Sequence, residues 1–448
     1  MRISVVGLGK LGSPLAAVLA HEGNTVIGVD VNEAFVAAIN EGRAPVEEPG
    51  LQELIDHNRS RLRATCAFDE AIAGSDVSFV IVPTPSLSNG FFTNEYVLAA
   101  MESIGAALRA KDGYHLVVIT STVIPGSTGG VIRRTLEQAS QRRLGETLGL
   151  CYSPEFIALG SVVRNLLYPD FALIGESDRR AGDLLEEIYR RSTANTPVVR
   201  RMNFVNAEIT KISVNTFVTT KITYANMVAE LCEHLPGADI DVVTDAVGSD
   251  SRIGSKYLRG ALGYGGPCFP RDNRAFAALA RSVGMSADIA EATDRVNDRQ
   301  VDRVVGLARR HARPGDTVAV LGLAYKPDTG VVEESQGVKI ARSLHRLGYR
   351  VVAYDPMADV RSALAGTAVP AASMAECVAD ADIVLVTTPW PEFRDLSPGP
   401  RGYGRKAVVI DCWRLLDPAV CDGDVKIVLL GSGSERLDES VQMAATGD

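Results

Sequence analysis

The chain has 448 residues, 46% of them hydrophobic and 23% charged, a globular composition and a length too great for one core. Its formal net charge of −9 argues against nucleic acid as the main partner, although a local basic site for a phosphate ligand stays possible. No apolar run approaches the roughly 20 residues that cross a bilayer, so no membrane span is expected.

The seven cysteines are odd in number, scattered, and without a C-x-x-C pair. This spacing excludes a disulfide framework and the common zinc sites, so no metal is predicted. The first residues enter an apolar strand directly, and we expect no signal peptide. A reducing cytoplasm is the compartment that fits best.

A glycine-rich turn follows the first expected strand. Strand, helix and strand are expected at residues 3–6, 14–21 and 25–29. Gly7, Gly9 and Gly12 form the pattern G-x-G-x-x-G between the first two, and Asp30 ends the second strand. This is the dinucleotide-binding fingerprint, in which the glycines permit a tight turn, close approach of a pyrophosphate and close helix packing. Asp30 would bind the ribose hydroxyls and repel a 2′-phosphate, which favours NAD over NADP.

Further apolar strands alternate with helices, as in a parallel sheet covered on both faces. They are expected at residues 75–82, 116–119, 150–152 and 171–175. Thr84, Thr122 and Glu155 follow three of these strands, at the edge where such sheets bind ligands. Each has a plainer alternative: Thr before Pro often caps a turn, and the alternative for Glu155 is a solvated charge.

One long helix is expected over residues 203–234, because this stretch has no interior Pro or Gly. A helix of this length suits a link between two lobes and a dimer surface. Lys211 and Asn215 are four residues apart and share one of its faces with Thr219. The alternative is a solvated polar stripe.

The stretch at residues 263–272 carries the strongest signal for chemistry. Its glycines allow the backbone to approach a ligand, and Cys268 stands at the start of a helix expected over residues 270–281. The positive end of the helix dipole favours the thiolate, which is the nucleophilic form. Asp272 follows one turn later. The alternative is a buried structural cysteine.

The last third repeats the strand pattern of the first. Strands are expected at about residues 317–321, 351–355, 382–388 and 407–411. Only Gly322 of the glycine triplet is kept, which argues against a second NAD, and Lys326 suits a phosphate-bearing ligand. We therefore expect an α/β fold with two Rossmann-like, doubly wound parallel-sheet domains, joined by a long central helix and a helical middle domain. The expected ranges are 1–200, 201–300 and 301–431, with a disordered tail at 432–448.

In this order, the motifs resemble the UDP-glucose/GDP-mannose dehydrogenase family over about residues 1–430. They are residues 7–12 with Asp30, 48–51, 83–85, 121–123, 153–156, Lys211 with Asn215, 252–254, 265–272 and 322–326. The resemblance implies oxidation of the C6 alcohol of a nucleotide sugar to a carboxylate, with two NAD⁺ and no metal. It favours UDP-glucose as substrate, bound by the C-terminal lobe. The long helix, as a dimer surface, indicates a homodimer.

The resemblance also assigns roles. Cys268 would trap the aldehyde and carry a thioester, which water hydrolyses. The implied catalytic residues are Cys268, Lys211, Asn215, Asp272, Thr122 and Glu155. The implied NAD contacts are Gly7, Gly9, Lys10, Leu11, Gly12, Asp30, Pro83, Thr84, Ser121 and Thr122. The implied substrate contacts are Glu155, Phe156, Lys211, Asn215, Arg252, Tyr257, Arg259, Gly265, Tyr325 and Lys326.

The chain departs from the family pattern at four places. Phe35 stands where a basic residue often follows the NAD-binding Asp, and Lys10 stands where Tyr is usual. Leu159 replaces a Glu, which removes one site carboxylate, and Glu333 replaces an Arg, which reverses a charge. Three alternatives stay open on sequence: the same chemistry on GDP-mannose or another nucleotide hexose, a two-electron β-hydroxyacid-type dehydrogenase, and a non-catalytic binder of NAD and sugar nucleotides. The second has no use for Cys268.

Overall fold

The structure is a computed structural model that describes residues 1–396, 407–417 and 425–433. Cys421 and residues 434–448, which are most of the predicted tail, lie outside the described residues. The chain divides into two compact units, Met1–Ser213 and Val214–Asp448. The predicted boundaries of three domains stay a prediction.

The first unit is built on an eight-stranded sheet in the order β3-β2-β1-β4-β5-β6-β7-β8. Its strands are β1 (Arg2–Val6), β2 (Thr25–Val29), β3 (Leu62–Thr65), β4 (Val77–Val80), β5 (His115–Ile119), β6 (Leu148–Tyr152), β7 (Phe171–Glu176) and β8 (Val198–Met202). All neighbouring pairs are parallel except β6 and β7, which are antiparallel. The strand order reverses between β1 and β4, and open sheets of this kind bind ligands at such a switch point.

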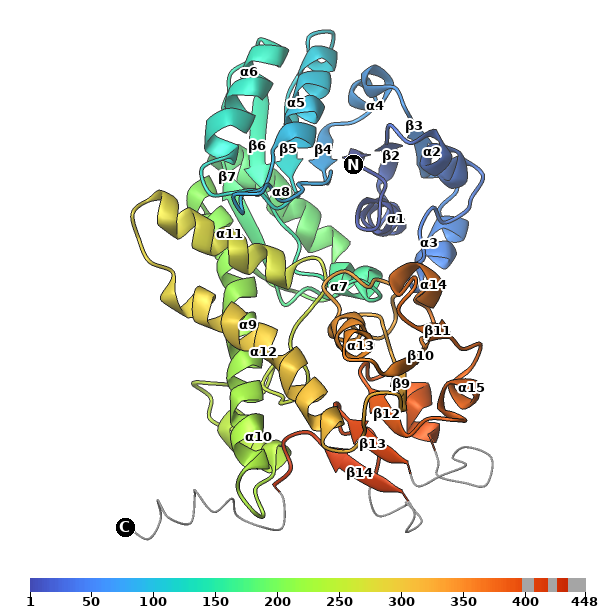
Figure 1. The fold of residues 1–448 in the computed structure, drawn as a ribbon. Helices are drawn as coiled ribbons and strands as arrows, with labels where there is room; N and C mark the ends of the chain where they lie inside the picture. Colours follow the sequence, from blue (N-terminus) through green and yellow to red (C-terminus); the bar gives the residue numbers. More distant parts are fainter. Residues whose placement is uncertain (397–406, 418–424, 434–448) are drawn as a thin grey trace. The chain divides into compact units, whose positions relative to one another are not determined.

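Helices cover both faces of this sheet (Figure 1). They are α1 (Gly12–His21), α2 (Glu33–Asn40), α3 (Leu51–His57), α4 (Phe68–Ala73), α5 (Glu95–Leu108), the π-helix η1 (Thr128–Ile132), α6 (Arg133–Ser140), α7 (Val162–Leu167) and α8 (Arg179–Ser192). One buried cluster joins α1, α3, α7 and α8 to one face, and a second joins α4, α5 and α6 to the other. The central strands β4, β5 and β6 are buried at every position because helices cover both of their faces, whereas the edge strands β3 and β8 include arginines and exposed positions.

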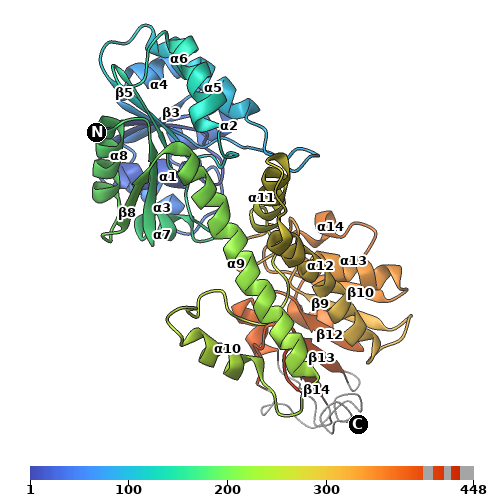
Figure 2. The same cartoon turned by 90° about the vertical axis from the view of Figure 1, so that its left-hand side faces the viewer.

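Helix α9 (Phe204–Glu233) confirms the long helix expected from the sequence, and the division between the two units falls within it. In the second unit, its residues 214–233 run beside α12 (Figure 2). Arg303 of α12 has a side chain that is 8% exposed and forms an ion pair of 2.5 Å with Glu233 at the end of α9. This contact fixes α9 against α12 at one end of the second unit.

The second unit contains a parallel six-stranded sheet in the order β11-β10-β9-β12-β13-β14. Its strands are β9 (Thr317–Leu321), β10 (Arg350–Tyr354), β11 (Val369–Pro370), β12 (Ile383–Val386), β13 (Val408–Asp411) and β14 (Lys426–Leu429). Its other helices are α10 (Ile240–Gly248), α11 (Phe269–Ser282), α12 (Asp288–Arg309), α13 (Gln336–Arg346), α14 (Val360–Ala363), α15 (Met374–Val378) and the 3-10 helix η2 (Pro391–Asp395). The two Rossmann-like sheets confirm the predicted fold class.

The two sheets share one turn geometry. After β1 the amide of Gly7 donates to Val29 O at 2.8 Å, and after β9 the amide of Gly322 donates to Tyr354 O at 2.8 Å. Gly322 has a φ of +103°, and Gly337 packs against its carbonyl so closely that a Cβ there would lie 2.4 Å from the oxygen. Gly337 thus takes the packing role that the sequence pattern assigns to Gly12, after a much longer loop.

No helix in the described ranges is both long enough and apolar enough to cross a membrane.

Candidate active site

The glycine turn of the first unit leaves open space at one position only. Gly7 has a φ of +97°, and a Cβ there would lie 2.6 Å from Ile81 O. A Cβ on Gly12 would lie 1.7 Å from Gly7 O, so neither position accepts a side chain. At Gly9 a Cβ would meet nothing within 4 Å. The turn is therefore closed by its two outer glycines and open at the middle one, as a phosphate-binding turn requires.

The other residues of this turn flank the opening. Lys10 is exposed and Leu11 is partly buried at the N-cap of α1. Asp30 lies at the end of β2 and accepts backbone hydrogen bonds from Leu8 N at 2.6 Å and Asn32 N at 2.8 Å. Asp30 therefore braces the turn itself, a role that the fingerprint does not specify.

Two neighbouring strand ends are tied together beside the turn. The Thr84 hydroxyl donates to Thr122 O at 2.8 Å, and the Ser121 hydroxyl donates to Val82 O at 2.7 Å. These bonds join the loops that follow β4 and β5, and Pro83 lies exposed between them. The structure thus brings Thr84, Ser121 and Thr122 together at the switch-point edge of the sheet.

Sequence reasoning missed Glu208, which binds the backbone of the loop that follows β5. Its side chain is fully buried on α9, and its two carboxylate oxygens accept from Gly126 N at 2.6 Å and Thr128 N at 2.7 Å. Burial raises the pKa of Glu208, while these hydrogen bonds lower it. The available signal was a single charged residue in the otherwise uncharged first part of the helix, residues 204–210.

Glu155 lies close to Lys211 within the first unit. The Lys211 ammonium donates to the Glu155 carbonyl at 2.6 Å and lies 4.5 Å from the centroid of the Phe156 ring. Loss of hydration raises the pKa of the Glu155 carboxyl to about 7, against the opposing effects of the Tyr189 hydroxyl and the Lys211 charge. A carboxyl with this pKa exchanges its proton near neutral pH, which suits general acid and base catalysis.

A second carboxylate fixes the loop that follows Glu155. Both oxygens of Glu48 accept backbone hydrogen bonds, from Gly160 N at 2.8 Å and from Val162 N at 2.6 Å. Leu159 belongs to this loop and packs against the apolar cluster that includes α7. The residue that departs from the family pattern is thus accommodated as a packing residue.

Cys268 is the N-cap of α11 in the second unit, as the sequence predicted, and its side chain is exposed. The helix begins with the bond from Asp272 N to Cys268 O at 2.8 Å. Asp272 is 1% exposed, and its carboxylate accepts from the Asn215 amide at 2.6 Å and from Arg271 Nε at 3.2 Å. The structure therefore joins the residue pair Asn215 and Asp272 one turn beyond an accessible thiol.

The loop before Cys268 is packed so closely that three of its residues must be glycine. A Cβ would lie 2.4 Å from Asn297 Oδ1 at Gly263 and 2.5 Å from Glu334 O at Gly265. At Gly266, whose φ is +81°, it would lie 2.6 Å from the Tyr325 ring. Gly265 and Tyr325 are both predicted substrate contacts. The Tyr325 ring thus packs against Gly266, the residue that follows Gly265.

The departure at Glu333 lies in the segment that supports this loop. Glu333 is exposed, and its carbonyl accepts from Gly266 N at 3.0 Å. The neighbouring Glu334 forms ion pairs with Arg274, at 2.6 Å, and with Lys339. The backbone of this segment therefore holds the Cys268 loop whatever charge stands at position 333.

The other predicted substrate residues are less closely assembled. Arg252 is exposed and paired with Asp250 at 2.6 Å. The Arg259 guanidinium donates to Trp413 O at 2.7 Å. Tyr257 has a φ of +62°, is exposed, and lies edge-on to Phe269 with ring centroids 6.3 Å apart. Lys326 follows Tyr325 in the loop after β9.

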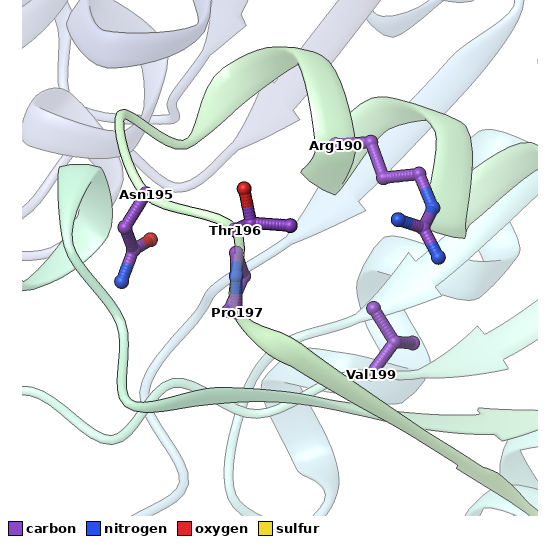
Figure 3. Close-up of a pocket in the computed structure, with 5 residues that line it drawn as sticks. All are labelled: Arg190, Asn195, Thr196, Pro197 and Val199. Carbon is purple, nitrogen blue, oxygen red and sulfur yellow. The ribbon is translucent and has the colours of Figure 1, made fainter.

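A small hollow lies elsewhere in the first unit, beside the edge strand β8 (Figure 3). It is lined by Arg190, Asn195, Thr196, Pro197 and Val199. None of the predicted site residues lines it.

Comparison with known proteins decides the family. The chain matches the NAD binding domain of the UDP-glucose/GDP-mannose dehydrogenase family over residues 1–193, the central domain over residues 205–299 and the UDP binding domain over residues 319–418. The chain belongs to this family. The resemblance stated from the motifs is confirmed, and the chain is an NAD-dependent nucleotide-sugar 6-dehydrogenase.

Relatives of the dehydrogenase cover between 79% and 96% of its length. The chain is 38% identical over 421 residues to the UDP-glucose 6-dehydrogenase AglM of Haloferax volcanii, covering 93% of this chain and 97% of that one. It is 36% identical over 361 residues to the GDP-mannose 6-dehydrogenase of Pseudomonas aeruginosa, covering 79% and 81%. A UDP-glucose dehydrogenase structure from Pyrobaculum islandicum shares 35% identity and a TM-score of 0.87, covering 96% and 98%.

Proposed function

We propose that this dehydrogenase oxidises the C6 alcohol of UDP-glucose to the carboxylate of UDP-glucuronate, in two steps, through a covalent bond to Cys268. The observation that carries the proposal is the exposed thiol at the N-terminus of α11, preceded by a loop of obligatory glycines. The similarity to AglM and to the Pyrobaculum islandicum enzyme supports UDP-glucose as the substrate.

The residues of the first unit fit NAD. Gly9 leaves the open space that a pyrophosphate needs, and the N-terminus of α1 directs amide donors towards it. Gly7, Lys10, Leu11, Gly12 and Asp30 would contact the adenosine and phosphate portion, and Pro83, Thr84, Ser121 and Thr122 the remainder. When bound, NAD⁺ supplies the hydride acceptor for each oxidation.

Cys268 makes one anchor serve both oxidations. Its sulfur forms a bond to the aldehyde carbon of the half-oxidised sugar, and the aldehyde oxygen takes up a proton, giving a thiohemiacetal. Loss of a hydride and a proton converts this adduct to a thioester. Water then breaks the carbon–sulfur bond, which releases the carboxylate and returns the thiol. Overall, each sugar loses two hydrides and three protons and consumes one water.

The remaining catalytic residues act on charge and protons. Lys211 and Asn215, one turn apart on α9, stabilise the oxyanion of the adduct. Asp272, Thr122 and Glu155 move protons to and from that oxygen and the hydrolytic water. Glu155 suits this role because its pKa is raised to about 7 by loss of hydration.

The nucleotide sugar is held by groups that precede and follow the Cys268 loop. Arg252, Arg259 and Lys326 supply positive charge for the diphosphate, and Tyr257 and Tyr325 supply flat surfaces. Phe156 and Gly265 complete the contacts with the sugar. GDP-mannose is the second candidate substrate, because a GDP-mannose 6-dehydrogenase shares 36% identity with the chain.

The test counts NADH per sugar consumed, with excess NAD⁺ and limiting UDP-glucose or GDP-mannose. Two NADH per UDP-glucose support the proposal, whereas two per GDP-mannose with none from UDP-glucose transfer it to the second substrate. One NADH per sugar would contradict a four-electron reaction. A Cys268→Ser variant that forms acid at the normal rate would exclude the covalent path, while a loss of about a thousandfold or more would support it.

We also propose that two copies of the chain associate through α9. Phe217, Tyr224, Met227 and Leu231 are exposed by 68%, 50%, 48% and 58% and recur on one side of the helix. A continuous apolar stripe suits an isologous dimer, in which the same surface of each copy is buried. Light scattering after gel filtration measures the oligomeric state. A dimer for the unchanged chain and a monomer for Phe217→Glu would support the proposal. A monomeric unchanged chain would contradict it.

A further inference from the structure

Three oxygen atoms outside the predicted site form a chain that ends on Glu155. The Ser153 hydroxyl donates to Leu173 O at 2.8 Å and lies 2.7 Å from the Tyr189 hydroxyl. The Tyr189 hydroxyl lies 3.3 Å from Glu155 Oε1. Ser153 is fully buried at the end of β6, and Tyr189 is partly buried on α8. The chain therefore runs from a backbone carbonyl of β7 to the acid.

The number of protons in this chain depends on the state of Glu155. There are three links, and the two hydroxyls supply two protons. When Glu155 is protonated, each link holds one proton, directed from Glu155 to Tyr189, from Tyr189 to Ser153 and from Ser153 to Leu173 O. When Glu155 is ionised, the Ser153 proton still satisfies Leu173 O, so the single Tyr189 proton is shared between Ser153 and Glu155.

We propose that Tyr189 and Ser153 are positioning residues that set the protonation of Glu155, Tyr189 as its donor and acceptor and Ser153 as the competitor for the Tyr189 proton. The inference rests on the proposed function only in giving Glu155 a part in proton transfer. It adds two residues outside the predicted set, one of them on a helix, α8, that carries no predicted site residue.

Two other titratable groups lie near Glu155, and neither takes over the role proposed for Tyr189 and Ser153. Lys211 approaches from α9 and donates to the Glu155 backbone carbonyl, and its charge favours the ionised carboxyl. The Cys151 thiol on β6 interacts electrostatically with Tyr189, and burial raises the pKa of that thiol well above its usual range. Cys151 therefore stays neutral while Glu155 titrates, and Tyr189 donates to the carboxyl side chain.

The two residues predict shifts of opposite sign. The Tyr189 hydroxyl donates a hydrogen bond to the Glu155 carboxylate, and this bond is stronger than the one made with the neutral carboxyl. Tyr189→Phe removes it, so the Glu155 pKa rises by about one pH unit, a tenfold change in its ionisation constant. Ser153→Ala removes the competitor, so Tyr189 donates to Glu155 alone and the pKa falls. A purely structural role for these hydroxyls would give no such reversal.

The experiment is a pH titration of the unliganded protein by infrared difference spectroscopy, following the protonated-carboxyl band that disappears in Glu155→Gln. We expect an upward shift of its midpoint in Tyr189→Phe, a downward shift in Ser153→Ala, and the upward shift in the double variant. The matched control is Tyr114→Phe, since the Tyr114 hydroxyl is buried in the same unit without a hydrogen-bond partner among the described residues. That control should leave the midpoint unchanged.

Two results would overturn the proposal. One is an equal midpoint in the unchanged protein, Tyr189→Phe, Ser153→Ala and the double variant. The other is a shift of the same sign in Tyr189→Phe and Ser153→Ala. A second readout is the pH profile of NADH formation, whose acidic limb should move with the infrared midpoint. Because the infrared titration needs no substrate, it can succeed where UDP-glucose is not turned over. Failure of the proposed function and failure of this inference are therefore distinguishable.

Discussion

The side-chain amide of Asn215 donates a hydrogen bond of 2.6 Å to Oδ2 of Asp272. It joins α9 to the first turn of α11, whose N-cap is Cys268. Asp272 is 1% exposed, so its charge depends on Asn215 and Arg271 for compensation. The bond therefore fixes the acid and orients the amide at the same time.

Replacing Asn215 with Leu should both destabilise the fold and slow the reaction. The buried Asp272 carboxylate loses a donor, which costs about 1–3 kcal/mol of unfolding free energy. Urea unfolding gives this difference, and the rate of NADH formation gives the loss of activity. Asn206→Leu, at an exposed position of the same helix, is the control and should change neither.

The packing of Gly266 gives a second prediction. Gly266 and Gly254 both have positive φ, +81° and +73°, but a Cβ would lie 2.6 Å from the Tyr325 ring at Gly266 and meet nothing within 4 Å at Gly254. Both Ala variants pay about 1 kcal/mol for the left-handed backbone. Gly266→Ala should lose more, and its melting temperature should lie below that of Gly254→Ala. Equal melting temperatures would show that the Cys268 loop or Tyr325 shifts to accommodate the added Cβ without a cost in stability.

Much of this architecture is readable from the sequence because its signals are local. The expected helix at residues 203–234 matches α9, Phe204–Glu233, since neither Pro nor Gly interrupts it. The helix expected from residue 270 matches α11, with Cys268 at the N-cap. The fingerprint from Gly7 to Asp30 likewise lies within one strand–helix–strand unit.

What the sequence does not reveal depends on partners far along the chain. The antiparallel direction of β7 leaves no trace in its apolar pattern. Glu208 bonds to amides 82 and 80 residues away, and Glu48 to amides 112 and 114 residues away. Gly337 packs against Gly322 in the second sheet as Gly12 packs against Gly7 in the first. A long loop separates Gly322 from Gly337, so the spacing G-x-G-x-x-G does not identify it.

Buried His115 predicts acid sensitivity of the first unit. Lys111 Nζ lies 2.9 Å from Nδ1 and has only protons to donate, so Nδ1 accepts and Nε2 donates to Ser78 at 2.8 Å. Burial lowers the pKa of His115 to about 3, below the unfolded value of about 6.5. The unfolded chain therefore binds an extra proton between these values.

The stability that neutral His115 contributes is complete above pH 6.5 and is lost as the pH falls towards 3, by about 1.4 kcal/mol per pH unit. Urea unfolding at pH 7.5 and pH 5 measures this loss. His115→Asn removes the titrating ring, so its unfolding free energy should fall less between the two pH values. An equal fall in both proteins would contradict the assignment.

Glu208 gives the last prediction, because it holds the loop that carries Thr122. Its two oxygens accept from Gly126 and Thr128, and the carboxyl is fully buried. In Glu208→Gln one oxygen becomes an amide nitrogen, which faces a backbone N–H at hydrogen-bond distance and must move away. We expect a loss of about 1–3 kcal/mol in unfolding free energy and a higher KM for NAD⁺, with the pH profile unchanged since Glu155 is untouched. Thr210→Val, two residues along α9 and half-exposed, is the matched control. A Glu208→Gln protein with normal stability and normal KM would show that the loop holds its shape without this acid.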